Sequence, residues 1–360
     1  MFFLKKKELT TKERMSLIMQ HKEADRIPII DNPWNGTIAR WRKEGLPKYK
    51  SWSKYFGVDS FNPISIDISP RYPVKVIEET KDYTISTSPW GVTMKQFKKA
   101  DSTPEFLDFT VTSRDEWEKA KKKMDVNSNR LNLISNKYNY IRAKREGGWI
   151  SAQFWFGFDV AHSWMMGTEN MLILMYEDPE LVQDIYNTYL DRCIAHFDML
   201  YDKGYRFDEI TWPDDMGYKN TTFFSLDMYR NLLKPVHARA VKWAHDHGAY
   251  ARLHSCGDIM TFVPDLVEIG IDALNPLEVK AGMEPLKIKK EFGDKLTLHG
   301  GINAVLWDDK EAIIAEIERV VPQLKENGGY IFSSDHSIPN SVSLDNFKTI
   351  IDTVKVVGKY

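Results

Sequence analysis

Cysteine is scarce in this chain, which has two in 360 residues, at Cys193 and Cys256. Two cysteines cannot build the disulfide framework of a small secreted scaffold, so we expect a reduced, cytoplasmic protein. The sequence also lacks any run that approaches the ~20 apolar residues of a membrane-spanning helix. Its N-terminus has no apolar core of a secretory signal. We therefore expect no membrane partner.

The chain has no large surplus of one sign of charge either. Its formal net charge is −2, and its lysines and arginines are scattered along the sequence. Without a basic patch, the sequence gives no indication of a nucleic-acid partner. Aromatic residues, in contrast, are plentiful, with 11 Trp, 16 Tyr and 18 Phe. This is more than core packing needs, so we expect some of them to line a pocket.

Short apolar runs alternate with amphipathic helical runs along most of the chain. The candidate strands are 26–31, 65–68, 149–154, 209–212, 250–253, 273–277, 296–299 and 330–333. Short apolar strands separated by helices indicate a parallel sheet that is covered on both faces. Eight such strands suggest closure into a (β/α)8 or TIM barrel, and a chain of this length can form one such domain over residues 1–360.

The region after the second predicted strand breaks this rhythm. Alternating runs at 74–78 and 83–86 predict a hairpin, and a further extended run follows at 92–97. Ser113 then opens a helical pattern with the spacing of a capping box. We interpret residues 71–148 as an inserted hairpin and helical segment that lies over the mouth of the barrel.

The segment His254-Ser255-Cys256-Gly257 carries the most specific chemistry in the sequence. It follows the fifth predicted strand and places an imidazole and a thiol two residues apart. Such a pair suits a soft-to-borderline metal such as zinc. Two ligands are half a site, so further ligands must come from other strands.

In a (β/α)8 barrel, functional residues gather where the strands end. Five consecutive predicted strands deliver a carboxylate, imidazole or thiol to this rim: Asp215, His254 with Cys256, Glu278, His299 and His336. Further candidates lie at the ends of the first four predicted strands and are predicted to contact the substrate: Trp34, Asn35, Asp67, Trp155 and Trp212. The sequence thus predicts a metal site at the rim, beside an aromatic-lined pocket.

Four runs, LHSCGDI, NPLEVKAGM, HGGIN and SSDHSIP, resemble the uroporphyrinogen decarboxylase superfamily and are closest to its cobamide-dependent methyltransferase branch. The resemblance extends from Leu9 over essentially the whole chain and implies a (β/α)8 barrel. The haem-pathway decarboxylases carry an arginine-rich stretch after the first strand. Here residues 32–36 contain no arginine, and the next one is Arg40. A polyanionic tetrapyrrole would lack counter-ions, which argues against porphyrin decarboxylation.

The methyltransferase branch implies zinc bound by a His-x-Cys pair and a later cysteine. His254 and Cys256 match the pair, and His336 takes the place of the later cysteine. Members that demethylate aryl methyl ethers imply a second ligand set, Glu278 and His299 with a further acid such as Asp215. Both sets stay open, and we prefer the first because it includes the thiolate that zinc favours.

The resemblance implies a zinc-dependent enzyme that moves a methyl group from a small methylated molecule to a corrinoid (cobalamin) on a partner protein. The donor would be a methoxyarene, as for an O-demethylase, or a methylamine. Zinc would act as a Lewis acid on the donor heteroatom, and Asp215 would orient the substrate or protonate the leaving group.

Two alternative functions stay open. One is a decarboxylase of a smaller acid that uses Asp67 or Asp215 without metal. The other is a methyltransferase that moves a methyl group from methylcobalamin to a thiol. In either case the resemblance implies a monomer or a homodimer.

Overall fold

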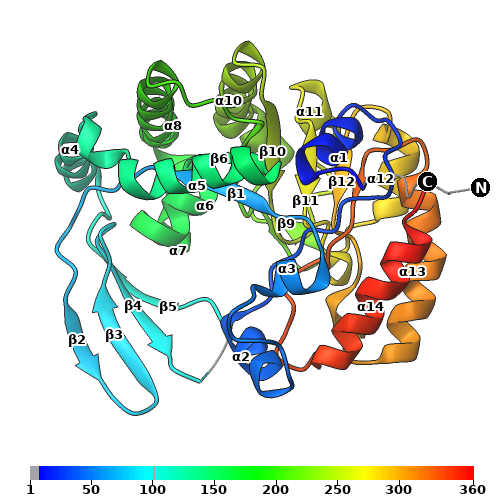
Figure 1. Ribbon diagram of the computed structural model, residues 1–360. Coiled ribbons are helices and arrows are strands. Elements are labelled where there is room, and N and C mark those ends of the chain that lie inside the picture. The colour runs from blue at the N-terminus through cyan, green and yellow to red at the C-terminus, as the bar shows by residue number, and fades with distance from the viewer. Residues whose placement is uncertain (1–7, 100–101) are drawn as a thin grey trace, which may run out of the picture.

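A computed structural model describes residues 8–99 and 102–360 as an α/β fold built on one curled parallel sheet (Figure 1). Seven strands form this sheet, in the order β1-β6-β7-β10-β11-β12-β13. Their bounds are Phe61–Ser65 (β1), Trp149–Gln153 (β6), Glu209–Pro213 (β7), Tyr250–His254 (β10), Ala273–Asn275 (β11), Thr297–His299 (β12) and Tyr330–Ile331 (β13). All neighbouring pairs are parallel, as the sequence predicts.

The first two predicted strands differ from the observed ones. Residues 26–33 are extended but make only isolated bridges, such as the parallel bridge of Ile29 to Phe332. On the other side, the amide of Asp59 donates to the carbonyl of Ile29 at 3.0 Å, so this segment lies between the two edges of the sheet. The strand predicted at 65–68 was placed too late in the chain: β1 covers Phe61–Ser65, and residues 66–68 already belong to the loop that follows it.

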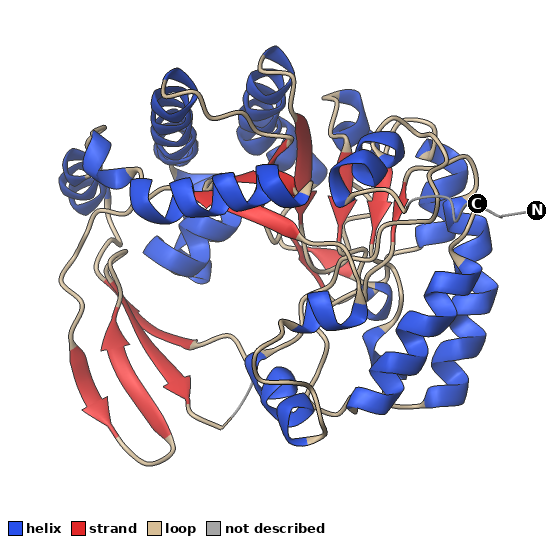
Figure 2. Ribbon diagram, in the orientation of Figure 1, coloured by secondary structure: helices blue, strands red, loops and turns tan. Residues whose placement is uncertain are grey.

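Helices cover the outside of the curled sheet, and the strands lie within (Figure 2). Their bounds are Thr11–Ile18 (α1), Asn35–Lys43 (α2), Trp52–Phe56 (α3), Arg114–Lys123 (α4), Leu133–Glu146 (α5), Phe158–Ala161 (α6), Thr168–Glu177 (α7), Pro179–Asp202 (α8), Leu226–Met228 (α9), Lys234–Asp246 (α10), Val263–Glu268 (α11), Pro285–Phe292 (α12), Lys310–Lys325 (α13) and Leu344–Val357 (α14). Ser113 caps α4 as predicted, and Thr10 caps α1 in the same way, each by accepting the amide of the glutamate three residues later. None of the helices in the described ranges is long and apolar enough to cross a membrane.

A second, antiparallel sheet follows β1 in the chain and stands away from the main body (Figure 1). Its strands are Val76–Glu79 (β2), Tyr83–Thr87 (β3), Val92–Phe97 (β4) and Glu105–Phe109 (β5). The first two form the predicted hairpin, and β5 was not predicted. The sheet touches the main body through Phe106, whose ring lies 5.5 Å from that of Trp164 in the π-helical turn η2 (His162–Met166).

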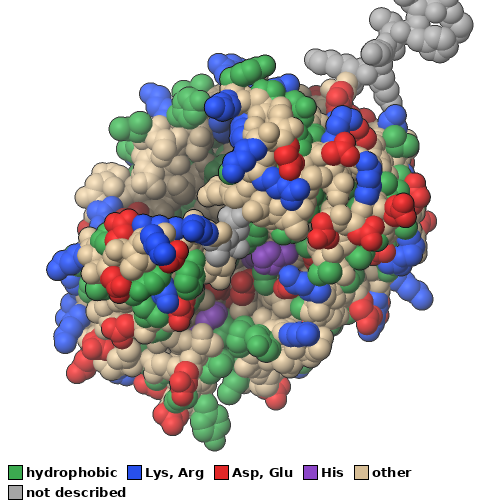
Figure 3. Space-filling model, turned by 90° about the horizontal axis from the view of Figure 1, so that it is seen from below, with side chains coloured by type: hydrophobic (Ala, Val, Ile, Leu, Met, Phe, Trp, Pro, Cys, Tyr) green, Lys and Arg blue, Asp and Glu red, His purple; other side chains and the backbone are tan. Residues whose placement is uncertain are grey.

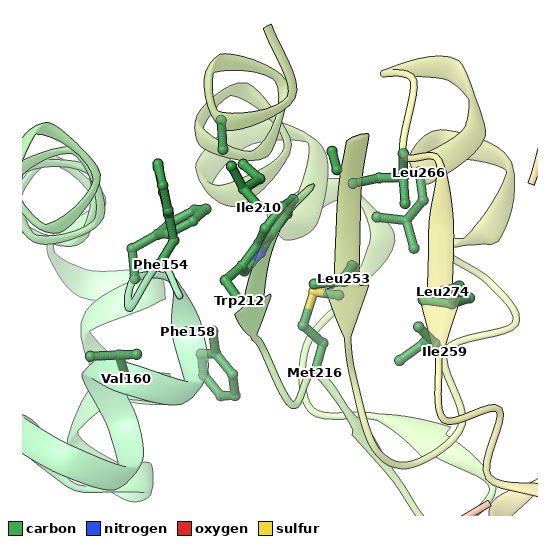
Figure 4. Close-up of a cluster of buried hydrophobic side chains, with 14 of the residues drawn as sticks. Phe154, Phe158, Val160, Ile210, Trp212, Met216, Leu253, Ile259, Leu266 and Leu274 are labelled. Carbon is green, nitrogen blue, oxygen red and sulfur yellow. The ribbon is translucent and has the colours of Figure 1, made fainter. Parts of the chain in front are cut away.

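The alternation of side chains along the parallel strands separates the core from the site. Ile210, Trp212, Leu253 and Leu274 belong to a buried cluster between the strands and the surrounding helices (Figure 4). Burial of each such side chain contributes about 1.5–3 kcal/mol. His254, next to Leu253, therefore points to the opposite face, toward the inside of the curled sheet. This places its imidazole where the loops after the strands converge.

Candidate metal centre

Three potential metal ligands from neighbouring strands meet at one end of the sheet. They are Asp215, just after β7, and His254 and Cys256, at the end of β10 and just beyond it; one ligand atom of each lies within 4.8 Å of the others. His254 Nε2 is 3.5 Å from Cys256 Sγ and 3.7 Å from Asp215 Oδ1. The strands bring them together because β7 pairs directly with β10, with Pro213 opposite His254.

Hydrogen bonds between adjacent loops fix these positions. The amide of Cys256 donates to Asp215 Oδ1 at 2.8 Å, and the amide of Met216 donates to Ser255 Oγ at 3.1 Å. Glu278, after β11, accepts the amide of Gly257 at 2.8 Å. The loop that carries Cys256 is therefore held by the loops that follow the two neighbouring strands, β7 and β11.

The electrostatics of the site favour a cation. Burial raises the pKa of the Cys256 thiol well above its usual range, and the nearby carboxylates of Asp215 and Glu278 raise it further. Burial, and after it the charges of Asp215 and Asp214, raise the pKa of Asp159, on α6, to about 8. Several acidic groups thus share this space, and Lys280 offsets part of their charge. A divalent cation would offset this repulsion, and the imidazole, thiol and carboxylate are donors that suit zinc.

Asp214 is a structural member of the site that the sequence prediction passed over in favour of Asp215. Its side chain and that of His237 on α10 are both 0% exposed, and His237 Nε2 lies 2.7 Å from Asp214 Oδ2. Its other oxygen accepts the amide of Asp159 at 2.9 Å. Asp214 thus ties the loops after β6 and β7 to α10, and so holds Asp215 in place.

Asp335 was also missed, and it holds three further loops together. It is fully buried, and it accepts the amide of Ala304 at 2.6 Å and that of Val279 at 2.9 Å. These bonds join the loops after β11, β12 and β13. The position of Asp335 at a strand end, beside the predicted His336, was the one sequence signal that could have marked it.

Nearly the whole chain matches one protein family. The family model described as "Uroporphyrinogen decarboxylase (URO-D)" matches residues 10–357. The chain belongs to the URO-D family. Curated relatives of this URO-D chain include the uroporphyrinogen decarboxylase of Vesicomyosocius okutanii subsp. Calyptogena okutanii, which is 25% identical over 191 residues, or 52% of each chain. That of Chlorobaculum tepidum is 25% identical over 192 residues, or 51% of each chain.

The chain thus spans about half the length of the curated relatives it matches. Among solved structures, a methyltransferase from Methanosarcina mazei shares the fold over nearly the full length of both chains. Its TM-score is 0.65 at 15% sequence identity, and the match covers 96% of this chain and 98% of that one. At this level of identity, the likeness is one of fold.

The other ligands predicted for this URO-D chain take different places. Glu278 lies beside the Cys256 loop, where its second oxygen is 3.4 Å from Lys280 Nζ. His336 is half-buried at the rim, with its ring 6.2 Å from that of Trp34, and lies outside the group of three close ligand atoms. His299 lies deeper, 4% exposed, with Nε2 3.1 Å from the carbonyl of Ile30. Burial, and after it the charge of Arg252, lower the pKa of His299 to about 3.

The predicted substrate contacts separate into rim and core residues. Trp212 was predicted to contact the substrate, but its ring is fully buried in the core, 5.2 Å from that of Phe156 and 5.5 Å from that of His237 (Figure 4). Its place in β7, opposite Leu253, turns it outward to the helices. Trp155 is half-buried, with its ring 5.9 Å from that of Trp164.

Asn35 and Asp67 complete the predicted set. Asn35 is the exposed first residue of α2. Asp67 accepts a hydrogen bond from the hydroxyl of Ser69 at 2.7 Å and pairs with Arg71 at 2.6 Å, and so stabilises a local turn.

The face of the molecule seen from below is hollowed, with histidine and acidic side chains in the hollow (Figure 3).

Proposed function

We propose that the chain is a zinc-dependent methyltransferase that moves a methyl group from a methylated small molecule to a corrinoid on a partner protein. The observation that carries this proposal is the group formed by Asp215, His254 and Cys256. Three protein ligands leave one position of a tetrahedral zinc site open, as catalytic zinc sites require. This ligand set joins the predicted His-x-Cys pair to an acid from the other predicted set.

The charges at the site suit this reaction. When bound, zinc supplies Lewis acidity to the heteroatom of the methyl donor. Asp215 and Cys256 provide the two negative charges that balance such an ion, and Glu278 holds the loop through the amide of Gly257. Trp34 and His336 place two rings at the rim, where a methoxyarene could be bound.

A porphyrinogen substrate fits the site less well, although the curated relatives are named for it. Arg40, the first arginine after the extended segment 26–33, pairs with Glu44 at 2.6 Å and donates to the carbonyl of Asn340 at 2.7 Å. Its guanidinium is therefore already engaged. The acidic groups around Cys256 would also repel a polycarboxylate. The Methanosarcina mazei methyltransferase has the same fold, so this scaffold accommodates methyl transfer.

The first test is metal content. We expect about one zinc per chain in the unaltered protein, and none after Cys256→Ala, which removes a ligand. Cys193→Ala is the matched control, because the other cysteine is fully buried in α8. Metal-free protein whose thermal midpoint is unaffected by Cys256→Ala would contradict the proposal.

The second test measures the reaction itself. The zinc-loaded protein is mixed with cob(I)alamin and a panel of methoxyarenes and methylamines, and we expect the absorption spectrum of methylcobalamin to appear with one donor class. Turnover of methylcobalamin with a thiol instead would assign the reverse, acceptor-side reaction. Release of carbon dioxide from a small acid by metal-free protein would support a decarboxylase.

A further inference from the structure

Asn275 joins the candidate ligand His254 to the next strand. It is the last residue of β11 and lies opposite His254 in the parallel register. Its side-chain Oδ1 is 2.7 Å from His254 Nδ1, and its Nδ2 donates to the carbonyl of His299 at 3.1 Å. Asn275 is 9% exposed, so both of its bonds are shielded from water.

These two contacts determine which nitrogen of His254 carries the proton. A backbone carbonyl only accepts, so the end of the Asn275 amide that faces His299 must be the NH2 group. The end that faces His254 is then the oxygen, which accepts a proton from Nδ1. A neutral His254 therefore keeps its lone pair on Nε2, the atom that lies 3.5 Å from Cys256 Sγ.

We propose that Asn275 is a positioning residue of the metal centre, which selects the ligating nitrogen of His254 and fixes the orientation of its ring. The inference rests on the proposed function for the presence and identity of the metal. Outer partners of this kind change metal affinity 10–100-fold when they are removed. The chain would bind zinc more weakly without this residue, although Asn275 has no ligand atom in the group of three.

An amide suits this position better than a carboxylate. The site already contains the acidic side chains of Asp215 and Glu278 beside the Cys256 thiol. A neutral acceptor fixes the tautomer of His254 without a further negative charge. The amide also has a donor for the carbonyl of His299, which a carboxylate lacks, so it braces β11 against β12.

The test is the zinc affinity of the full chain, measured by competition with a chromophoric chelator. We expect Asn275→Leu to weaken zinc binding 10–100-fold, and Asn275→Asp, which retains the acceptor for Nδ1, to weaken it less than Asn275→Leu. Asn136→Leu is the matched control. Like Asn275, this asparagine is buried and its side-chain amide is hydrogen-bonded. It lies on α5, however, and its Nδ2 donates to the carbonyls of Ser65 and Leu131. We expect it to leave zinc affinity unchanged.

A second measurement needs no substitution at Asn275. Long-range 15N–1H NMR on the metal-free protein, labelled at histidine and assigned with His254→Gln, reports which ring nitrogen of His254 is protonated. We expect the proton on Nδ1, and a proton on Nε2 would overturn the inference. Wild-type zinc affinity in Asn275→Leu would overturn it as well. If the unaltered protein binds no zinc, both this inference and the proposed function fail. A proton on Nε2, or wild-type zinc affinity in Asn275→Leu, overturns this inference alone and leaves the proposed function standing.

Discussion

Gly217 and Gly257 lie backbone against backbone beside Cys256. A side-chain carbon on Gly257 would overlap the carbonyl carbon of Gly217, and the φ of Gly257 is +80°. Just beyond this contact, the amide of Asp258 donates to the carbonyl of Tyr218 at 2.9 Å. The two glycines thus allow the loop after β7, which carries Asp215, to reach the loop that carries Cys256. The geometry of the candidate metal centre depends on this approach.

We predict that Gly257→Ala both destabilises the protein and weakens zinc binding. A left-handed φ costs a residue with a side chain about 1–2 kcal/mol, and the overlap with Gly217 adds about 1–3 kcal/mol. Gly248→Ala is the control, since Gly248 has a φ of +68° but no heavy atom within 4 Å of the added carbon. Urea unfolding and zinc competition check both effects. If Gly257→Ala loses no more unfolding free energy and zinc affinity than Gly248→Ala, the contact of Gly257 with Gly217 is unimportant.

The buried pair of Asp214 and His237 gives a second prediction. Asp214→Ala leaves a fully buried imidazole without its partner and frees the amide of Asp159. A buried polar group left without its partner costs about 1–3 kcal/mol, and more if the group is charged. Asp191→Ala removes the half-exposed partner of Arg239 and should cost less than about 1 kcal/mol. We would compare the unfolding free energies of the two variants in urea. Equal losses of unfolding free energy would argue against a structural role for Asp214.

The sequence allowed most of the parallel strands to be located, because short apolar runs that end in polar residues are a local signal. It also showed that His254 lies at the end of one of them and Cys256 just beyond it. Which acid joins this pair could not be found in this way, since it depends on strand neighbours and side-chain reach. β7 is next to β10 and delivers Asp215, whereas β13, which precedes His336, lies three strands away.

The misplacement of Trp212 has a different cause. Side chains alternate between the two faces of a strand, so the parity of each residue decides whether it faces the site or the helices. Trp212 pairs with Leu253 and faces the core, and Pro213 pairs with His254. The sequence shows the end of a strand but not its register against the neighbour, and one position separates a pocket residue from a core residue.

His299 gives a prediction for the pH dependence of stability. Burial lowers its pKa to about 3, so between pH 3 and about 6.5 the unfolded chain binds a proton that the folded chain does not. Stability is therefore full above pH 6.5 and falls as the pH is lowered. This residue alone should cost about 2 kcal/mol between pH 7 and pH 5. We expect His299→Gln to reduce the difference between urea unfolding free energies at these two pH values by that amount; an unchanged difference would contradict the assignment.

The raised pKa of Cys256 predicts that zinc binding releases a proton. Without metal, burial and the surrounding carboxylates keep this thiol protonated at neutral pH, whereas zinc binds the thiolate. We expect about one proton per zinc at pH 7.5, obtained from calorimetric titrations in two buffers of different ionisation enthalpy. Cys256→Ala should lose zinc binding together with this proton release. Cys193→Ala should behave as the unaltered protein, because that thiol is buried in α8. Zinc binding without proton release in the unaltered protein would mean that Cys256 is not a ligand, and the metal would then have to be bound by the imidazole and carboxylates of the rim.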